Sequence, residues 1–181
     1  MDTYLNGIML PAGQARLSAE DAAVQHAVGL FETMSVYHGQ VFRLKSHLNR
    51  LIQSADVLGM NRNLDRQNLE YAVKKSISHN QPERARLRLT VSPGPLSLLC
   101  DDHGKAAVAT PTVMVTAAEP IEYDPLYFEQ GITVRVGPGA ANPFDPVAGH
   151  KTLAYWARLR TLREAAVMGA GEVIWLNISN H

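Results

Sequence analysis

The chain has 181 residues, enough for one large domain or two small ones, and its 46% hydrophobic and 19% charged residues are ordinary for a globular protein. Its 17 basic and 17 acidic side chains balance, so no global field favours nucleic acid or an anionic membrane. The single cysteine, Cys100, excludes an intramolecular disulfide, and no run approaches the roughly 20 apolar residues of a membrane span. Because a secretory signal pattern is also absent, we expect a cytoplasmic enzyme or binding protein.

The first part of the chain predicts a strand-rich domain with two helices. An Asn6-Gly7 turn separates two short strands within residues 4–10, and a helical turn over residues 18–25 is expected to use Ser18 as its N-cap. The pattern then predicts strands over 30–37 and 40–44 joined at His38-Gly39, helices from Leu44 to the stop signal at Gly59 and over 66–78, and strands over 85–92 and 112–117. We expect residues 1–118 to fold as one N-terminal α/β domain.

The second part predicts another, smaller set of elements. Residues 119–130 carry two prolines and little periodicity, which indicates an interdomain linker. Residues 131–136 are predicted as a strand, followed by a Gly/Pro-rich loop that leads to Lys151. An amphipathic helix over about 155–166 and a strand over 172–177 complete residues 131–181. The whole order predicts a mixed α/β (α+β) chain without the regular alternation of a doubly wound sheet.

Two cations attract attention as candidate site residues. Lys151 follows the Gly/Pro-rich loop and precedes a helix, which suits a Schiff-base lysine, although an exposed surface lysine shows the same local pattern. Arg50 lies well off the apolar arc of its helix, so it is either solvated or directed at an anion such as phosphate, which a guanidinium binds through two parallel hydrogen bonds.

Two strand segments add weaker signals. Arg86 and Arg88 alternate with leucines, so both arginines lie on one strand face, either as an outward polar surface or as a grip for a substrate carboxylate. Gly29 precedes the strand that begins at residue 30, and a glycine there allows a close approach to the backbone. The sequence shows no zinc-ligand spacing, P-loop or G-x-G-x-x-G pattern.

Taken in order, several segments resemble the fold-type IV, or class IV, pyridoxal-phosphate enzymes, which include branched-chain and D-amino-acid aminotransferases and aminodeoxychorismate lyases. The matching segments are YLNG at 4–7, GLFETM-x-VYHGQVFRLKSHLNRL at 29–51, RLTVSPG at 88–94 and GHKTL-x-Y at 149–155. The resemblance covers nearly the whole chain. It implies a two-domain fold, with a small N-terminal α/β domain and a larger barrel-like domain that is incomplete here.

The resemblance also implies a site and a reaction. Lys151 matches the lysine that forms the Schiff base with pyridoxal 5′-phosphate, Arg50 the arginine that binds its phosphate, and Tyr155 the tyrosine that contacts its phenolic oxygen. Phe31 matches a pocket-wall aromatic residue, and Arg88 lies near a strand position that meets the substrate carboxylate in some members. The implied reaction is amino transfer between an amino acid and a 2-oxo acid, in a homodimer.

The chain departs from the family at two places. Ala154 stands where members often have asparagine, and relatives continue beyond His181 into a segment with the acidic partner of the cofactor ring nitrogen. We therefore expect a C-terminally truncated chain whose second domain exposes apolar surface. Two alternatives stay open: the pyruvate-eliminating lyase reaction of the same family, and a non-catalytic binding or dimerising domain. Thr33 favours the lyase-like members, whereas Tyr155 favours the branched-chain group.

Overall fold

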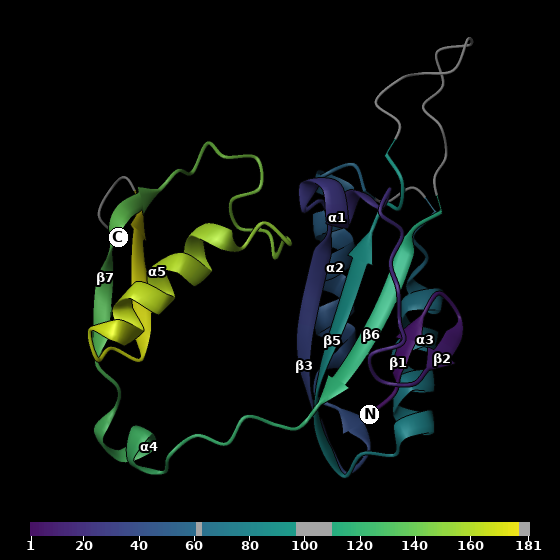
Figure 1. The fold of residues 1–181 in the computed structure, drawn as a ribbon, viewed down its shortest axis with the longest axis horizontal. Coiled ribbons are helices and arrows are strands. Elements are labelled where there is room, and N and C mark those ends of the chain that lie inside the picture. The colour runs from purple at the N-terminus through teal and green to yellow at the C-terminus, as the bar shows by residue number, and fades with distance from the viewer. Residues whose placement is uncertain (61–62, 97–109, 178–181) are drawn as a thin grey trace. The chain divides into compact units, whose positions relative to one another are not determined.

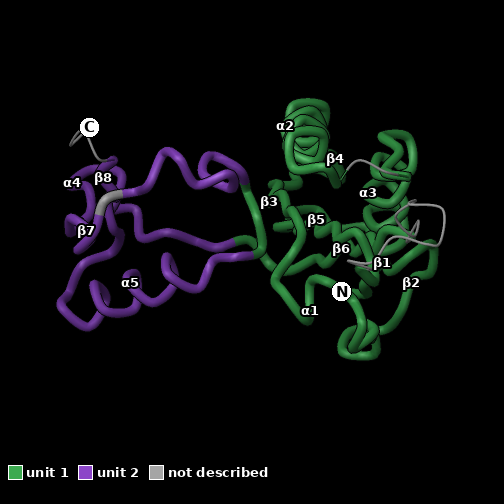
Figure 2. Tube along the Cα trace, turned by 90° about the horizontal axis from the view of Figure 1, so that it is seen from above, with its two compact units in different colours: residues 1–120, 151–153 green, residues 121–150, 154–181 purple. Residues whose placement is uncertain are grey.

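The computed structural model describes residues 1–60, 63–96 and 110–177, so Cys100 lies outside the described residues. The chain divides into two compact units, residues 1–120 with 151–153, and residues 121–150 with 154–181 (Figure 2). Within the described ranges, no helix is long and apolar enough to cross a bilayer.

The first unit contains a six-stranded antiparallel sheet with the strand order β2-β1-β6-β5-β3-β4 (Figure 1). Its strands are β1 (Thr3–Leu5), β2 (Ile8–Leu10), β3 (Leu30–Tyr37), β4 (Gln40–Val41), β5 (Arg84–Ser92) and β6 (Thr112–Ala118). The strands predicted in these places are confirmed, and β3 has the bounds that the sequence indicates. The predicted return strand over 40–44 is shorter than expected, because Arg43 adopts a left-handed conformation with φ 52° and leads directly into a helix.

Both predicted hairpin turns are present. Asn6 and Gly7 have φ values of 46° and 94°, and His38 and Gly39 have 48° and 68°. Positive φ at both central residues is the geometry of a type I′ turn, whose twist matches that of the two flanking strands. The turns therefore set the β1–β2 and β3–β4 registers, in which Leu5 pairs with Ile8 and Tyr37 with Gln40.

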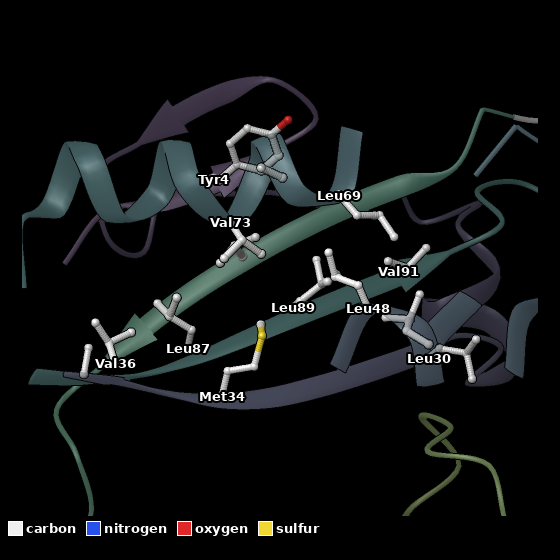
Figure 3. Close-up of a cluster of buried hydrophobic side chains, with 14 of the residues drawn as sticks. Tyr4, Leu30, Met34, Val36, Leu48, Leu69, Val73, Leu87, Leu89 and Val91 are labelled. Carbon is white, nitrogen blue, oxygen red and sulfur yellow. The ribbon is translucent and has the colours of Figure 1, made fainter. Parts of the chain in front are cut away.

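Helices α2 (Leu44–Val57) and α3 (Arg66–Asn80) cover one face of this sheet (Figures 1 and 2). Alternation along β5 directs Leu87, Leu89 and Val91 toward the helices, where they are buried. Arg86 and Arg88 are directed to the other face, as the sequence predicted. Figure 3 shows side chains of the strands and of α2 and α3 meeting in a single apolar cluster. This sheet is the rigid base for the candidate site residues of the first unit.

The short helix α1 (Ala22–His26) begins later than predicted, and its N-cap is Asp21 rather than Ser18. The Asp21 carboxylate accepts a hydrogen bond from the Ala23 amide at 2.8 Å, and it also accepts hydrogen bonds from the hydroxyls of Ser92 at 2.7 Å and Thr112 at 2.6 Å. Asp21 is buried, so it ties α1 to the ends of β5 and β6. Asp21 is the N-cap because its carboxylate also binds residues of β5 and β6, which are too far along the chain to appear in a local sequence pattern.

The second unit has four elements: α4 (Leu126–Gln130), β7 (Val134–Ala141), α5 (Trp156–Val167) and β8 (Glu172–Asn177). β7 and β8 pair in parallel, and α5 connects and contacts both. β7 runs through Gly137, Pro138 and Gly139, which the sequence assigned to a loop, because pairing resumes after a register shift between Val136 and Ala140. Large apolar side chains are exposed here, including those of Phe128, Phe144 and Trp156.

Asp21 makes the stability of the first unit depend on pH. Burial alone would raise the pKa of Asp21, but the bonds from Thr112, Ser92 and the Ala23 amide together hold the pKa below its ordinary value. The contribution is therefore fully present above about pH 4 and is lost as pH falls through the folded-state pKa. We expect Asp21→Asn to lower the free energy of unfolding by about 1–3 kcal/mol at neutral pH and to flatten its decline in acid. Urea unfolding from pH 3 to 7 measures both effects, and parallel curves for parent and variant would contradict them.

Candidate functional site

Lys151, Thr152 and Leu153 lie against the outer edge of β3 in the first unit. The Phe31 amide donates to the Lys151 carbonyl and the Leu153 amide to the Gly29 carbonyl, both at 3.0 Å, while Leu30 and Thr152 form an antiparallel bridge. β4 pairs with the other end of the same strand, since Val36 pairs with Val41. The three residues thus extend the edge of the sheet, and α5 begins only at Trp156. Lys151 is held by backbone hydrogen bonds rather than by a helix N-terminus.

This pairing brings three of the predicted site residues together. Residues opposite each other in antiparallel strands have side chains on the same face, so Lys151 and Phe31 share the face that α2 and α3 do not cover. The Lys151 Nζ lies 4.3 Å from the centre of the Phe31 ring, and the Arg88 Cζ lies 3.6 Å from it. Both distances are within the range of cation–π attraction. A half-buried amine and a guanidinium therefore meet at one buried aromatic ring.

Gly29 is required where the edge segment approaches β3. A Cβ at position 29 would lie 2.5 Å from the Leu153 Cδ1 and 2.7 Å from the Val91 carbonyl oxygen. The leucine side chain can move, but the carbonyl belongs to the β5 backbone and cannot. The sequence signal that a glycine here permits a close approach is thus explained by the chain segment that carries Lys151.

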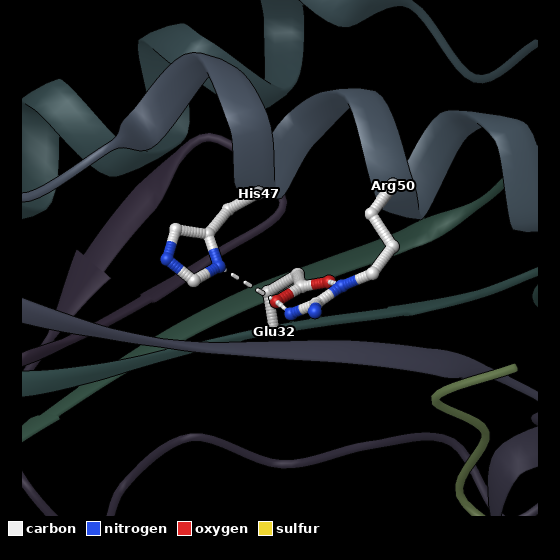
Figure 4. Close-up of polar contacts among 3 residues, drawn as sticks. All are labelled: Glu32, His47 and Arg50. Atoms are coloured by element: carbon white, nitrogen blue, oxygen red, sulfur yellow. Dashed lines mark hydrogen bonds and ion pairs between the residues drawn. The ribbon is translucent and has the colours of Figure 1, made fainter.

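On the opposite, helix-covered face of β3, Glu32 forms a charged cluster with two residues of α2 (Figure 4). The Arg50 Nε donates to the Glu32 Oε1 at 2.6 Å, the Arg50 Nη2 donates to Oε2, and the His47 Nδ1 lies 2.8 Å from Oε2. The Glu32 side chain is 1% exposed and that of Arg50 is 56% exposed. Arg50 is thus partly solvated and also paired with a carboxylate of the same chain, and its contact with a phosphate stays a prediction.

Glu32 is the residue that the sequence reasoning missed. It shares the inward face of β3 with Leu30, Met34 and Val36, which alternation alone would have revealed. A carboxylate at an inward strand position needs a cation nearby, and His47 and Arg50 lie one turn apart on the next helix. An acidic residue at an inward strand position, followed by two basic residues one helical turn apart, therefore predicts this cluster.

Tyr155 belongs to the second unit, where it precedes α5 and lies near Arg158, whose Cζ is 5.2 Å from its ring centre. Thr152, by contrast, is buried in the first unit and bridges Leu30. In the part of the chain that the structure describes, no three histidine, cysteine or acidic residues gather as metal ligands.

Comparison with known families identifies these segments. The profile of the amino-transferase class IV family matches residues 29–181, which include Phe31, Glu32, Arg50, Arg88 and Lys151. The chain belongs to the class IV aminotransferase family. Its mixed architecture is that of the fold-type IV enzymes, as the resemblance implied.

Individual relatives support the same assignment. A probable branched-chain-amino-acid aminotransferase of Rickettsia typhi is 27% identical over 176 residues, covering 96% of this chain and 59% of the relative. A bifunctional aminodeoxychorismate lyase and D-amino acid transaminase of Mycobacterium tuberculosis is 30% identical over 189 residues, covering 100% and 62%. The chain therefore spans about three fifths of the length of these curated relatives.

Solved structures show the same fold. A hypothetical aminotransferase from Mycobacterium tuberculosis, in a form bound to α-ketoglutarate and PMP, superposes with a TM-score of 0.76 at 25% identity, covering 99% of this chain and 63% of that one. The branched-chain amino acid aminotransferase of Escherichia coli superposes with a TM-score of 0.84 at 23% identity, covering 98% and 60%.

The close approach at Gly29 gives a test of how Lys151 is held. We expect Gly29→Ala to lower the free energy of unfolding by about 1–3 kcal/mol, because the new methyl group meets the Val91 carbonyl on one side and pushes Leu153 of the edge segment away on the other. Hydrogen exchange of the Phe31 and Leu153 amides should accelerate as the edge segment detaches. Gly139→Ala is the control, since a Cβ there meets nothing within 4 Å. Unchanged exchange at Phe31 and Leu153 in Gly29→Ala would show that the close approach is not limiting.

Proposed function

We propose that this chain is the Lys151-bearing part of a pyridoxal-phosphate-dependent aminotransferase that moves an amino group between an amino acid and a 2-oxo acid. The observation that carries the proposal is the backbone pairing of residues 151–153 with β3, which holds the Lys151 amine beside Phe31 and Arg88. Family membership adds support, because the matched profile spans all of these residues.

The residues of the first unit fit pyridoxal 5′-phosphate by their chemistry. The cofactor offers an aldehyde, an aromatic ring and a phosphate, and this unit offers a primary amine, a phenyl ring and guanidinium groups. When bound, the cofactor accepts the electrons of the bond that breaks at the substrate carbon. A solved relative at 24% identity, a hypothetical aminotransferase from Mycobacterium tuberculosis, is in a PLP-bound form.

Each residue has a proposed role. The Lys151 amine would hold the cofactor through its aldehyde carbon, with loss of water; once a substrate amine has replaced it there, the released amine would move the proton at the substrate carbon. Arg50 binds the phosphate, and Tyr155 donates a hydrogen bond to the phenolic oxygen; both roles rest on the family resemblance. Phe31 forms an apolar wall that excludes water beside the amine, and the Arg88 guanidinium binds the carboxylate of the substrate.

A second reaction is favoured by one relative. The Mycobacterium tuberculosis protein that is 30% identical carries both aminodeoxychorismate lyase and D-amino acid transaminase activity in its name. Both reactions begin with the same amine and the same cofactor, so the first unit serves either. Pyruvate release from aminodeoxychorismate, measured with purified chain and cofactor, separates the lyase from the aminotransferase.

We further propose that the protein acts in the cytoplasm and that it is a homodimer. The dimer is what the family resemblance implies, and sedimentation velocity tests it. The alternative function is a non-catalytic binding or dimerising domain. It predicts that the chain sediments as a dimer while Lys151 does not react with the cofactor.

Reaction of Lys151 with the cofactor tests the proposed function directly. We expect the purified chain to develop an absorbance band with pyridoxal phosphate, and borohydride to fix the cofactor to Lys151, located by peptide mapping. Lys151→Ala should lose both signals. Lys74→Ala is the control, because the Lys74 side chain is 68% exposed and pairs with Glu70. Labelling that is unchanged in Lys151→Ala would overturn the assignment.

The proposed role of Arg88 is tested by replacing it and, as a control, its neighbour Arg86 on the same face of β5. We expect Arg88→Gln to weaken binding of a 2-oxo acid about tenfold, since a charge-assisted bidentate bond to a carboxylate is lost. Titration calorimetry of the cofactor-loaded chain measures this. Arg86→Gln, two residues away on the same face of β5, should bind as the parent does. Equal losses in the two variants would indicate a general charge effect in place of a carboxylate site.

A further inference from the structure

The Glu32 cluster joins a fully buried anion to a largely exposed cation. Its carboxylate lies on the inward face of β3, surrounded by the apolar core, while the Arg50 side chain is 56% exposed and that of His47 is 21% exposed. Both oxygens of the carboxylate are engaged: Oε1 by the Arg50 Nε, and Oε2 by the Arg50 Nη2 and the His47 Nδ1. Glu32 is therefore enclosed by the core, and Arg50 reaches the surface of the first unit.

We propose that Glu32 is a positioning residue that orients the Arg50 guanidinium for the phosphate of the cofactor. This inference rests on the proposed function. An arginine side chain has several rotatable bonds, and ordering it on binding reduces affinity. The two bonds from Glu32 hold the Nε–Nη2 edge of the guanidinium and so define its plane. The Arg50 side chain is 56% exposed, so an anion can approach it from solvent while Glu32 holds this edge.

A purely structural role for the pair is the competing explanation. Buried ion pairs contribute little net stability compared with apolar residues of similar volume, so a link between β3 and α2 does not need a charge at position 32. Holding a guanidinium in one plane favours a carboxylate, because its two coplanar oxygens accept from Nε and Nη2 through two parallel hydrogen bonds. His47 restrains Oε2 from the other side, which limits rotation of the carboxylate itself.

The comparison of pyridoxal phosphate with pyridoxal separates the two explanations, since pyridoxal has the aldehyde but no phosphate. We expect Glu32→Gln to raise the dissociation constant of pyridoxal phosphate about tenfold and to leave that of pyridoxal within about twofold. Arg50→Ala should show the same selective loss. The double variant should bind pyridoxal phosphate as weakly as Arg50→Ala does, because Glu32 acts only through Arg50.

The control is Glu83→Gln, which removes the same charge from the first unit at an exposed pair with His38 and should bind both aldehydes as the parent does. Equal loss of pyridoxal and pyridoxal phosphate in Glu32→Gln would overturn the inference in favour of a structural role. Additive losses in the double variant would also overturn it, since they would mean that Glu32 acts independently of Arg50.

A second variant and a second readout keep the test decisive if Glu32→Gln does not fold. Arg50→Lys keeps the charge but cannot bond Glu32 through a fork, so the same selective tenfold loss is expected. In ¹⁵N spectra, the parent should show a slowly exchanging Arg50 Nε–H signal that shifts with pyridoxamine phosphate but not with pyridoxamine. Full phosphate discrimination in Arg50→Lys, or no phosphate-dependent shift in the parent, would overturn the inference. A phosphate-dependent shift without reaction at Lys151 would instead overturn only the proposed aminotransferase function.

Discussion

The backbone pairing of residues 151–153 with Gly29, Leu30 and Phe31 is the contact on which the candidate site depends. The amine of Lys151 is on a short segment between a Gly/Pro-rich loop and a helix of the second unit. Without the pairing it would have the mobility of an ordinary surface lysine. With the pairing, the backbone that carries Lys151 is fixed to a six-stranded sheet whose strands β3 and β5 carry most of the buried side chains. The sheet of the first unit therefore orders the backbone of residues 151–153, and with it the position of Lys151.

The two faces of β3 carry different arrangements of charged side chains. On the face away from the helices, the Lys151 amine and the Arg88 guanidinium both lie against the Phe31 ring. On the helix-covered face, Glu32 pairs with Arg50 and His47. Because Glu32 is buried, removing its cationic partners would leave a buried carboxylate without compensation, so this arrangement is coupled to folding of the first unit. The side chains of Phe31 and Glu32, which are consecutive residues of β3, thus take part in separate clusters on opposite faces of the sheet.

Much of the fold could be predicted from the sequence because its signals are local. The Asn6-Gly7 turn, the strand β3 and the strand β8 follow from turn chemistry and alternation. The cap of α1 could not be predicted, since Asp21 is selected by Ser92 and Thr112, which lie 71 and 91 residues away. β7 was expected to stop before Gly137, but its pairing with β8 carries it further.

The site was predicted unevenly for a similar reason. Lys151, Arg50 and Arg88 were found as isolated cations and by resemblance, whereas the contact of Lys151 with Phe31 depends on a pairing that no local pattern contains. Glu32, by contrast, was not predicted, although alternation along β3 indicates that this charged side chain faces the core. A charge on the apolar face of a strand is a signal in its own right.

Residues 29–31 and 151–153, which pair at the edge of the sheet, are far apart along the chain, and this affects the order in which the protein folds. Closing a flexible loop of roughly 120 residues between Phe31 and Lys151 would cost about 4 kcal/mol of chain entropy. When the first 118 residues are already folded, the effective loop shrinks to roughly 30 residues and the cost falls to about 3 kcal/mol. During synthesis on the ribosome the N-terminal sheet emerges first, so the lysine arrives at a finished docking edge. On this ground we expect the pairing of Lys151 with β3 to be a late step in folding.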